Sequence, residues 1–188
     1  MRALMWIVLA ACGTKPAAPV GNADRGRGSA AQATAAKEDC TSRVEGWKPG
    51  NVDRFSYEDG GKHGFRDGKG RVVITAQYNH VYEFSPYGIA AVVDATHPFL
   101  FIDARGKVLA QAFAYDNGPD YFQEGVARIV DADKKVGFLG ERGDIAIVPR
   151  FVAAASFCHG KAEVEIDGET YFIDKHGNKT TPPPLDKE

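Results

Sequence analysis

The feature that most constrains the fold is a set of anchor residues that recur at nearly constant spacing. Phenylalanine recurs at intervals of 36, 37 and 34 residues, and glycine recurs five positions later at the same intervals. These anchors are Phe65, Phe101, Phe138 and Phe172, followed by Gly70, Gly106, Gly143 and Gly177. Self-similarity at such a period indicates a repeat architecture in which each unit is one supersecondary structure.

The anchors divide the chain into three full repeats and part of a fourth. The full copies span residues 64–94, 101–131 and 137–167, and the fourth begins at Tyr171. Another glycine recurs near the end of each full copy and is followed two positions later by alanine, at Gly88, Gly125 and Gly160. The register of several anchors at once indicates one structural unit copied three times.

Each repeat predicts about three short strands. Asp103–Gly106 and Asp174–Gly177 place Asp at the first and Gly at the fourth position of a tight turn, where Asp accepts backbone N–H groups and Gly tolerates a positive φ. The turn joins two strands into a hairpin. The Gly-x-Ala segment leads into a third strand with alternating apolar residues, as in Ala162, Val164 and Ile166.

Because one such repeat cannot bury both of its faces, neighbouring repeats must stack. The sequence therefore predicts an all-β array of about 3.5 antiparallel repeats of ~36 residues, open and curved or solenoid-like. The chain begins and ends in mid-repeat, so a small closed, propeller-like ring is the alternative. The open array is favoured because so few repeats rarely close a ring.

The first eleven residues have the pattern of a signal peptide. Arg2 precedes nine apolar residues, which is too short for a membrane-spanning helix of about 20 residues but long enough for the apolar region of a signal peptide. The run ends in Leu9-Ala10-Ala11-Cys12, which resembles the lipobox of bacterial lipoproteins. The resemblance implies lipidation of Cys12 and a membrane-anchored protein of the cell envelope, facing the periplasm or the cell exterior. The alternative is an ordinary signal peptide followed by a coincidental cysteine.

Composition sets the remaining boundaries. Residues 12–39 comprise the lipidated cysteine and a segment rich in Ala, Gly, Pro and Ser that lacks aromatic residues, which predicts a flexible tether. Residues 40–63 are expected to form an N-terminal cap or half-repeat, residues 64–181 the repeat domain, and residues 182–188 a disordered tail.

Two cysteines remain beyond Cys12. Since an envelope protein meets an oxidising environment, Cys40 and Cys158 are candidates for one disulfide. It would close a loop of more than about 100 residues and stabilise the fold by roughly 4–5 kcal/mol. Two unpaired thiols are the alternative.

Several functional classes lack support in the sequence. With 23 basic and 25 acidic residues the net charge is −2, which gives no basic footprint for nucleic acid. No histidine pair has metal-ligand spacing, and no nucleophile or phosphate-loop motif is found in a strand-turn-helix context. Asp67, Asp103, Glu141 and Asp174 recur near the same turn, which indicates a structural role because an active site is needed only once. We therefore expect no catalytic residues, no metal and no cofactor.

In each repeat a connector joins the hairpin to the Gly-x-Ala segment. These connectors are less repetitive than the strands, and they supply the candidate binding residues. Tyrosine offers apolar area together with a hydroxyl group and is favoured at interfaces. The candidate surface consists of Tyr78, Tyr82, Tyr87, Tyr115, Tyr121, Asp116 and Asp120. The alternatives are that the tyrosines pack as repeat core and that the two aspartates belong to a solvated loop.

The repeats resemble the WG-repeat family. Lys62-His63-Gly64-Phe65 and Lys135-Val136-Gly137-Phe138 take the place of the Trp-Gly start, and Pro149-Arg150-Phe151 matches the Pro-aromatic step. The namesake Trp is absent from all copies, and Leu100 stands where the second copy would have its glycine. The resemblance implies a binding or scaffold role without naming a ligand. We expect a non-enzymatic interaction protein that binds protein or glycan through its connectors. An envelope hydrolase acting on glycan or peptide is the alternative, and a purely structural spacer is a third hypothesis.

Overall fold

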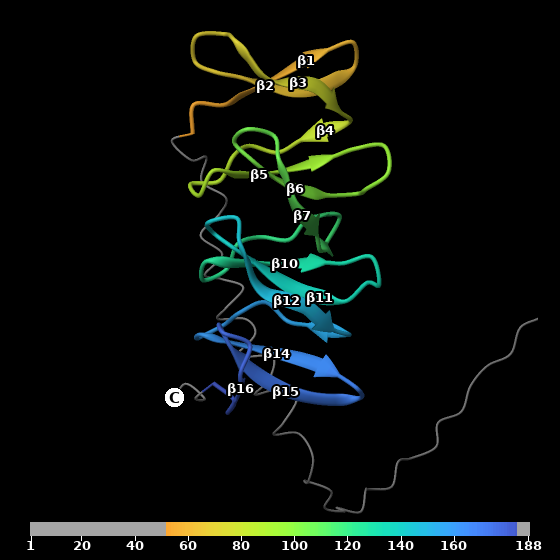
Figure 1. Cartoon of the computed structure of the whole chain (residues 1–188), viewed down its shortest axis with the longest axis vertical. Helices are drawn as coiled ribbons and strands as arrows, with labels where there is room; N and C mark the ends of the chain where they lie inside the picture. The colour runs from red at the N-terminus through yellow and green to blue at the C-terminus, as the bar shows by residue number, and fades with distance from the viewer. Residues whose placement is uncertain (1–51, 184–188) are drawn as a thin grey trace, which may run out of the picture.

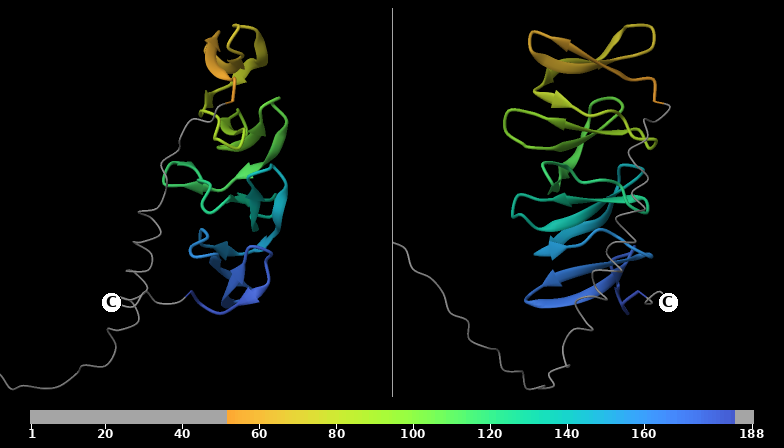
Figure 2. Two further views of the ribbon diagram at one scale, coloured as in Figure 1. Left: turned by 90° about the vertical axis from the view of Figure 1, so that its left-hand side faces the viewer. Right: turned by 180° about the vertical axis from the view of Figure 1, so that it is seen from behind.

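The computed structural model describes residues 52–183, and every regular element among them is a β-strand. The strands stack along one long axis, from β1 at one end to β15 and β16 at the other (Figure 1). The two ends remain apart in the other views as well (Figure 2). The predicted all-β open array is confirmed, and the ring is not formed.

Within residues 52–183 the strands are short and pair antiparallel throughout. They are β1 (Phe55–Asp59), β2 (Lys62–Arg66), β3 (Val72–Tyr78), β4 (His80–Val81), β5 (Ile89–Val93), β6 (Leu100–Asp103), β7 (Val108–Ala112), β8 (Ala114–Tyr115), β9 (Gly118–Pro119), β10 (Val126–Val130), β11 (Val136–Gly140), β12 (Ile145–Phe151), β13 (Ala153–Ala154), β14 (Lys161–Ile166), β15 (Glu169–Asp174) and β16 (Lys179–Thr180). The described strands form sheets in the orders β1-β2-β3, β12-β11-β10-β7-β6-β5-β4, β13-β14-β15-β16 and β8-β9.

The recurring phenylalanines form one packed pair in each repeat. In the first repeat the rings of Phe65 and Phe84 meet edge to face with centroids 4.8 Å apart, and in the third Phe138 and Phe157 do so at 4.9 Å. All four side chains are buried. Such pairs contribute about 0.5–1.5 kcal/mol beyond the burial of their area. The spacing seen in the sequence is therefore the spacing of a repeated core contact.

The recurring aspartates hold the turns, as predicted. In Asp67, Asp103 and Asp174 the Oδ1 atom accepts the backbone N–H groups of the residues two and four positions later, at 2.8–3.0 Å. The third repeat differs because Gly140 takes the position of these aspartates and has no carboxylate to hold the turn. Its N–H still donates to the Asp144 carbonyl at 2.8 Å, a backbone bond that the other three turns also make. Glu141 therefore does not share the role of the three aspartates.

The turn glycines adopt positive φ angles and also permit the repeats to stack. A Cβ atom on Gly106 would lie 3.3 Å from the Ile74 side chain, and one on Gly143 would lie 3.2 Å from Leu109. Each contact is with the preceding repeat. The turn glycine thus serves both the hairpin and the interface between neighbours.

The glycine before the anchor phenylalanine lets a partner strand bulge across it. A Cβ atom on Gly137 would lie 2.5 Å from the backbone nitrogen of Pro149, and Gly64 has an equally close backbone contact with β3. Both partner strands are bulged at this point. In the second repeat Leu100 takes this place and pairs with Gln111 without the bulge.

Without that bulge the second repeat reaches the next pairing sooner. In the second repeat Ala112 pairs with β10. The equivalent residues are Val81 of the first repeat, which pairs with β5, and Ala154 of the third, which pairs with β14. Ala112 comes 6 positions after its turn glycine, whereas Val81 and Ala154 come 11 positions after theirs. The residues that remain before the connector form the hairpin β8–β9, which has no counterpart in the other described repeats.

Candidate functional site

The second repeat holds most of the predicted binding residues, on the hairpin and connector that depart from the repeat pattern. Tyr115, Asp116 and Tyr121 are exposed there, and Tyr87 of the first connector is exposed as well. Tyr82 is half-buried. Five of the seven predicted residues are thus accessible to a ligand.

Two of the seven require a correction. Tyr78 is 5% exposed and packs in the core of the first repeat with Phe65 and Ile74. Burial and then the nearby Asp94 carboxylate raise the pKa of its hydroxyl. Asp120 is 3% exposed. Neither side chain can contact a ligand, because the fold uses both in its interior.

Asp120 belongs to a buried ion pair that holds the hairpin in place. Its two carboxylate oxygens accept hydrogen bonds from Nε and a terminal nitrogen of Arg128 at 2.9 and 2.7 Å. Oδ2 also accepts the backbone N–H of Arg128 at 2.8 Å. This bidentate geometry fixes both side chains and satisfies most of their hydrogen-bonding groups.

Arg128 extends this clamp to the hairpin and to the third repeat. Its guanidinium carbon lies 4.4 Å from the ring centroid of Phe113 and 5.2 Å from that of Tyr115. The same guanidinium donates a hydrogen bond to the Ala154 carbonyl at 3.1 Å. One buried side chain therefore positions the hairpin that presents Tyr115 and Asp116.

The hairpin turn is tight and has the backbone conformation of a two-residue loop. Asp116 and Asn117 both have positive φ angles, 44° and 66°. Two successive positive φ values match the twist of the flanking strands. The turn residues consequently project from the stack, where Asp116 and Asn117 are exposed.

Half-buried rings accompany the exposed tyrosines of the connectors. Tyr82 and Phe99 have centroids 6.2 Å apart, and Tyr87 and Phe122 have centroids 5.5 Å apart. Burial, and secondly the proximity of Tyr121, raises the pKa of Tyr82. We call Tyr82, Tyr87, Phe99, Tyr121 and Phe122 the aromatic patch.

The sequence pattern missed Phe99, Phe122 and Arg128 as parts of this region. Phe122 occupies the repeat position of the buried Phe84 and Phe157, but it is only half-buried. Arg128 occupies a strand position where the first repeat has the buried Ala91. The third repeat has the charged and exposed Glu163 at this position, so no signal in the sequence indicated that Arg128 is buried.

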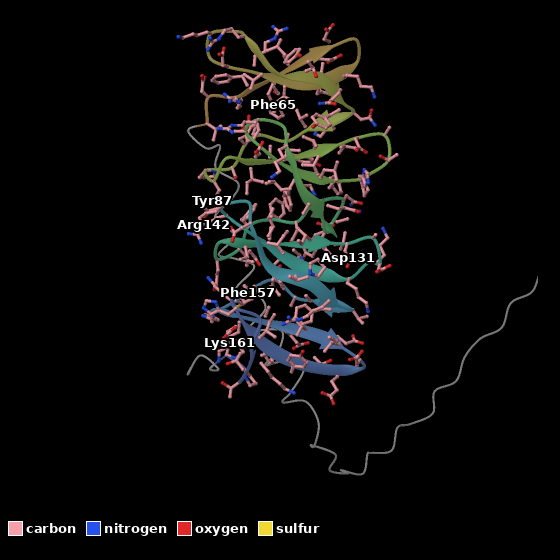
Figure 3. All side chains as sticks on the ribbon, viewed as in Figure 1. Phe65, Tyr87, Asp131, Arg142, Phe157 and Lys161 are labelled. Atoms are coloured by element: carbon pink, nitrogen blue, oxygen red, sulfur yellow. The ribbon has the colours of Figure 1, made fainter. Side chains whose placement is uncertain are left out.

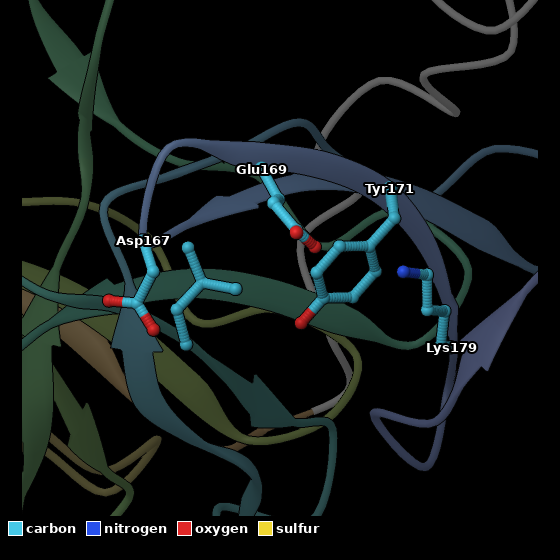
Figure 4. A pocket seen from close by; sticks show the side chains of 5 residues that line it. Asp167, Glu169, Tyr171 and Lys179 are labelled. Atoms are coloured by element: carbon cyan, nitrogen blue, oxygen red, sulfur yellow. The ribbon is translucent and has the colours of Figure 1, made fainter.

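The end of the stack carries a separate shallow hollow of about 410 Å³ between β14, β15 and β16 (Figure 4). Asp167 and Glu169 line it, and the Lys179 Nζ lies 4.6 Å from the ring centroid of Tyr171. Within residues 52–183 no group of three or more His, Cys, Asp or Glu side chains is arranged to hold a metal ion.

The cysteine predictions are only partly within the described residues. Cys158 is disulfide-bonded. Cys12 and Cys40 lie outside the described residues, so the lipidation of Cys12 and the Cys40–Cys158 pairing stay predictions. In the described part of the chain, no helix is long and apolar enough to cross a membrane.

One repeat of the chain matches a known protein family. Residues 64–94 match the family described as WG containing repeat. These residues coincide with the first repeat delimited from the sequence, Gly64 to Asp94. No curated protein matches the chain.

Proposed function

We propose that this chain, whose residues 64–94 match the family described as WG containing repeat, is a lipid-anchored interaction protein of the bacterial cell envelope. In this proposal the protein has no catalytic activity and binds a protein or a glycan. The binding residues are those of the second repeat's hairpin and connector.

The observation that carries the proposal is the rigid presentation of exposed aromatic residues where the repeats differ. Tyr115 and Tyr121 are 48% and 41% exposed, and both lie next to the buried Arg128–Asp120 pair. A preorganised aromatic surface loses little conformational entropy on binding. Tyrosines of this kind are common among residues that dominate binding energy.

The proposed anchor gives this surface a location. The predicted tether spans residues 12–39. A flexible chain of that length has ends roughly 25–30 Å apart on average. An acylated Cys12 would therefore hold the body near the membrane while leaving its surface open to envelope partners.

For the alternative function, an envelope hydrolase, the candidate location is the hollow at the end of the stack. Asp167 and Glu169 bring two carboxylates to the hollow at the end of the stack. The hollow is shallow, whereas a general acid normally requires a carboxyl group shielded from water. Release of sugar or peptide from cell-wall material by the wild type, and not by Asp167→Asn/Glu169→Gln, would favour this alternative.

Cross-linked capture from a bacterial envelope extract tests the binding surface. We expect the mature wild-type chain to retain a protein or glycan and the Tyr115→Ala/Tyr121→Ala variant to retain it roughly tenfold more weakly. Val148→Ala is the control, because Val148 is 66% exposed and lies on β12, away from the hairpin. Equal capture by all three chains, or no capture by any, would contradict the proposal.

Metabolic labelling with a fatty-acid analogue tests the anchor separately. The wild type should be labelled and should sediment with membranes, whereas Cys12→Ala should do neither. Equal labelling of the two chains would exclude Cys12 as the site of acylation.

A further inference from the structure

Strand β1 has a free edge, whereas the equivalent strands of the later repeats are paired on both sides. β5, β10 and β14 each pair on this side with a strand that comes earlier in the chain, namely β4, β7 and β13. β1 pairs with β2 alone, and it is the outermost strand at its end of the stack (Figure 1). The repeat itself therefore shows which kind of structure this edge accepts.

The paired strands identify the backbone groups that face the free edge. Ser56 lies opposite the anchor phenylalanine of its hairpin, as Ala91 of β5 does. The Ala91 carbonyl accepts the N–H of the residue after β4 at 2.9 Å, and Val93 pairs with His80. Because every second residue of a strand directs its N–H and C=O to the same side, Ser56 and Glu58 direct theirs to the free edge. Within residues 52–183 no backbone N–H group reaches either carbonyl.

The side chains at this end are also less covered than their counterparts. Phe55 is 60% exposed, whereas the residues at its repeat position are at most 1% exposed, namely Ala90, Ala127 and Ala162. The adjacent turn gives the same result. A Cβ atom on Gly70 would meet nothing within 4 Å, whereas one on Gly106 would lie 3.3 Å from the Ile74 side chain. An apolar side chain can therefore pack beside Phe55.

β1 is held firmly in its hairpin, so its edge is preformed. The Tyr57 hydroxyl accepts the backbone N–H of Ala76 at 3.0 Å, and the Arg66 guanidinium carbon lies 4.1 Å from the Tyr57 ring centroid. The register with β2 is regular over all five residue pairs. β1 contains neither the proline nor the bulge that commonly blocks an edge strand. Adding a strand to such an edge costs little ordering of the protein.

The opposite end of the stack argues against a second copy joined end to end. Lys161 lies at that end, away from Phe65 (Figure 3), and its Nζ donates hydrogen bonds to the Thr181 and Pro182 carbonyls at 2.8 and 3.0 Å. Pro182 and Pro183 have no N–H group to donate to a neighbouring strand. This end is therefore a poor source of a strand for β1.

The charge of β1 argues against a second copy side by side and favours a basic partner. Glu58 and Asp59 are exposed, and β1 contains no basic residue. Two antiparallel β1 strands would bring the carboxylates of both copies together, which is unfavourable. Glu58 forms no ion pair with any other residue of the described chain. A basic side chain directly opposite Glu58 would be stabilised there.

We propose that the free edge of β1 accepts an extended segment of a partner protein, which pairs antiparallel with β1 and places a basic residue opposite Glu58. The segment donates backbone N–H groups to the Ser56 and Glu58 carbonyls and accepts the Glu58 N–H. A residue three positions after the basic one lies opposite Phe55, and an apolar side chain there covers the ring. This surface goes beyond the proposed function, because it lies at the end of the stack and not on the hairpin β8–β9.

A defined peptide tests the pairing. The probe is the acetylated and amidated peptide Thr-Lys-Val-Thr-Val-Thr, added to the full chain and followed by NMR of the backbone amides. It should shift the Ser56 and Glu58 signals and protect the Glu58 amide from hydrogen exchange. Glu58→Pro removes an N–H that faces the free edge and none that bonds β2, so it should abolish binding. Glu58→Gln, the matched control, should weaken binding only roughly two- to fivefold. Absence of binding to the wild type, or equal binding to Glu58→Pro, would overturn the proposal.

A charge reversal tests the basic partner without a proline. The peptide Thr-Glu-Val-Thr-Val-Thr should bind the wild type roughly two- to fivefold more weakly than the lysine peptide, and Glu58→Lys should reverse this order. An unchanged order would overturn the pairing opposite Glu58. Tyr115→Ala/Tyr121→Ala should bind both peptides like the wild type, so failure of the proposed function leaves this result unaffected.

Hydrogen exchange of the full chain alone tests whether the edge is accessible. The Glu58 amide should exchange rapidly, whereas the Val93 amide, at the equivalent position of β5, should be protected by its pairing with His80. Equal protection of the two amides would mean that the edge is already paired, within the chain or with a second copy, and would overturn the proposal.

Discussion

The second repeat differs from the first and third at the residue before the anchor phenylalanine, and the extra hairpin of the second repeat results from that difference. Gly64 and Gly137 let the next strand bulge across them. In both repeats, the residue that pairs with the strand of the connector's Gly-x-Ala segment comes 11 positions after the turn glycine. Leu100 pairs without such a bulge, and in the second repeat the equivalent residue comes only 6 positions after the turn glycine. The residues released in this way form the projecting hairpin β8–β9.

The second repeat also differs in its phenylalanine pair and in the polarity of one buried strand. Its phenylalanine pair, Phe101 and Phe122, has centroids 5.7 Å apart, compared with 4.8 and 4.9 Å in the other repeats. Its central strand carries the buried Arg128, which pairs with Asp120. The comparison teaches that the shared anchors build the stack, whereas the residues that break the pattern build the candidate site.

The largest effect is expected from removing the clamp that only the second repeat has. Arg128→Met should destabilise the protein by about 3–5 kcal/mol, because it leaves the Asp120 carboxylate buried without its partner. The free energy of unfolding in urea measures this loss.

A double variant sharpens that test. Asp120→Leu/Arg128→Met should recover much of the stability, since no buried charge then lacks a partner. Arg150→Met is the control, because the Arg150 guanidinium makes a surface hydrogen bond to the Gly177 carbonyl. A single variant as stable as the wild type would show that the clamp is dispensable.

The next largest effect should come from closing the backbone crossing in the third repeat. Gly137→Ala places a Cβ atom 2.5 Å from the Pro149 nitrogen, so β11 and β12 must separate, at a cost of about 3 kcal/mol. Gly118→Ala, in the hairpin, meets nothing closer than 3.7 Å and should change stability by less than about 1 kcal/mol. Thermal unfolding of both variants measures the difference, and equal midpoints would refute the role assigned to Gly137.

A smaller effect is expected where the repeats agree, at the turn aspartates. The hydrogen bond from the Arg71 backbone holds the pKa of Asp67 below its ordinary 3.8, and the Asn178 backbone does the same for the pKa of Asp174. Because the folded-state pKa is lowered, the stabilisation is complete above pH 3.8 and disappears as the pH falls through the folded-state value.

The pH dependence of unfolding checks this assignment. Asp67→Asn/Asp174→Asn should be less stable than the wild type at neutral pH and should lose less stability on acidification. Asp133→Asn, at an exposed turn position, is the control and should behave like the wild type. Parallel pH profiles for all three chains would contradict the role of the turn carboxylates.

The smallest effect is expected in the hairpin turn itself. Asn117 has a φ of 66°, which a β-branched residue adopts only at a cost, so Asn117→Val should destabilise by about 1 kcal/mol. Asn117→Gly should be nearly neutral, because glycine adopts this conformation freely. Urea unfolding of the two variants tests the turn, and a tolerated valine would mean that the hairpin does not retain its geometry in solution.

Much of the fold was predictable because its determinants are local and recur. The Phe65 and Gly70 spacings marked the repeats, and Asp67 at a turn implied its bonds to the following backbone. The accessibility of the candidate site was harder to predict. Tyr78 and Tyr87 have the same side chain in the same repeat, yet one is 5% and the other 45% exposed.

By itself, the sequence determined the period, the turns, the antiparallel strands and the residues available to form a surface, since these depend on neighbours along the chain. Only the tertiary structure decided that the array stays open. It also decided that the second repeat, with Leu100 in place of Gly64 and Gly137, forms an extra hairpin and lacks the bulge. It also placed Asp120 inside, against Arg128. Register and burial depend on which strands meet in space, and that information is distributed over the whole stack.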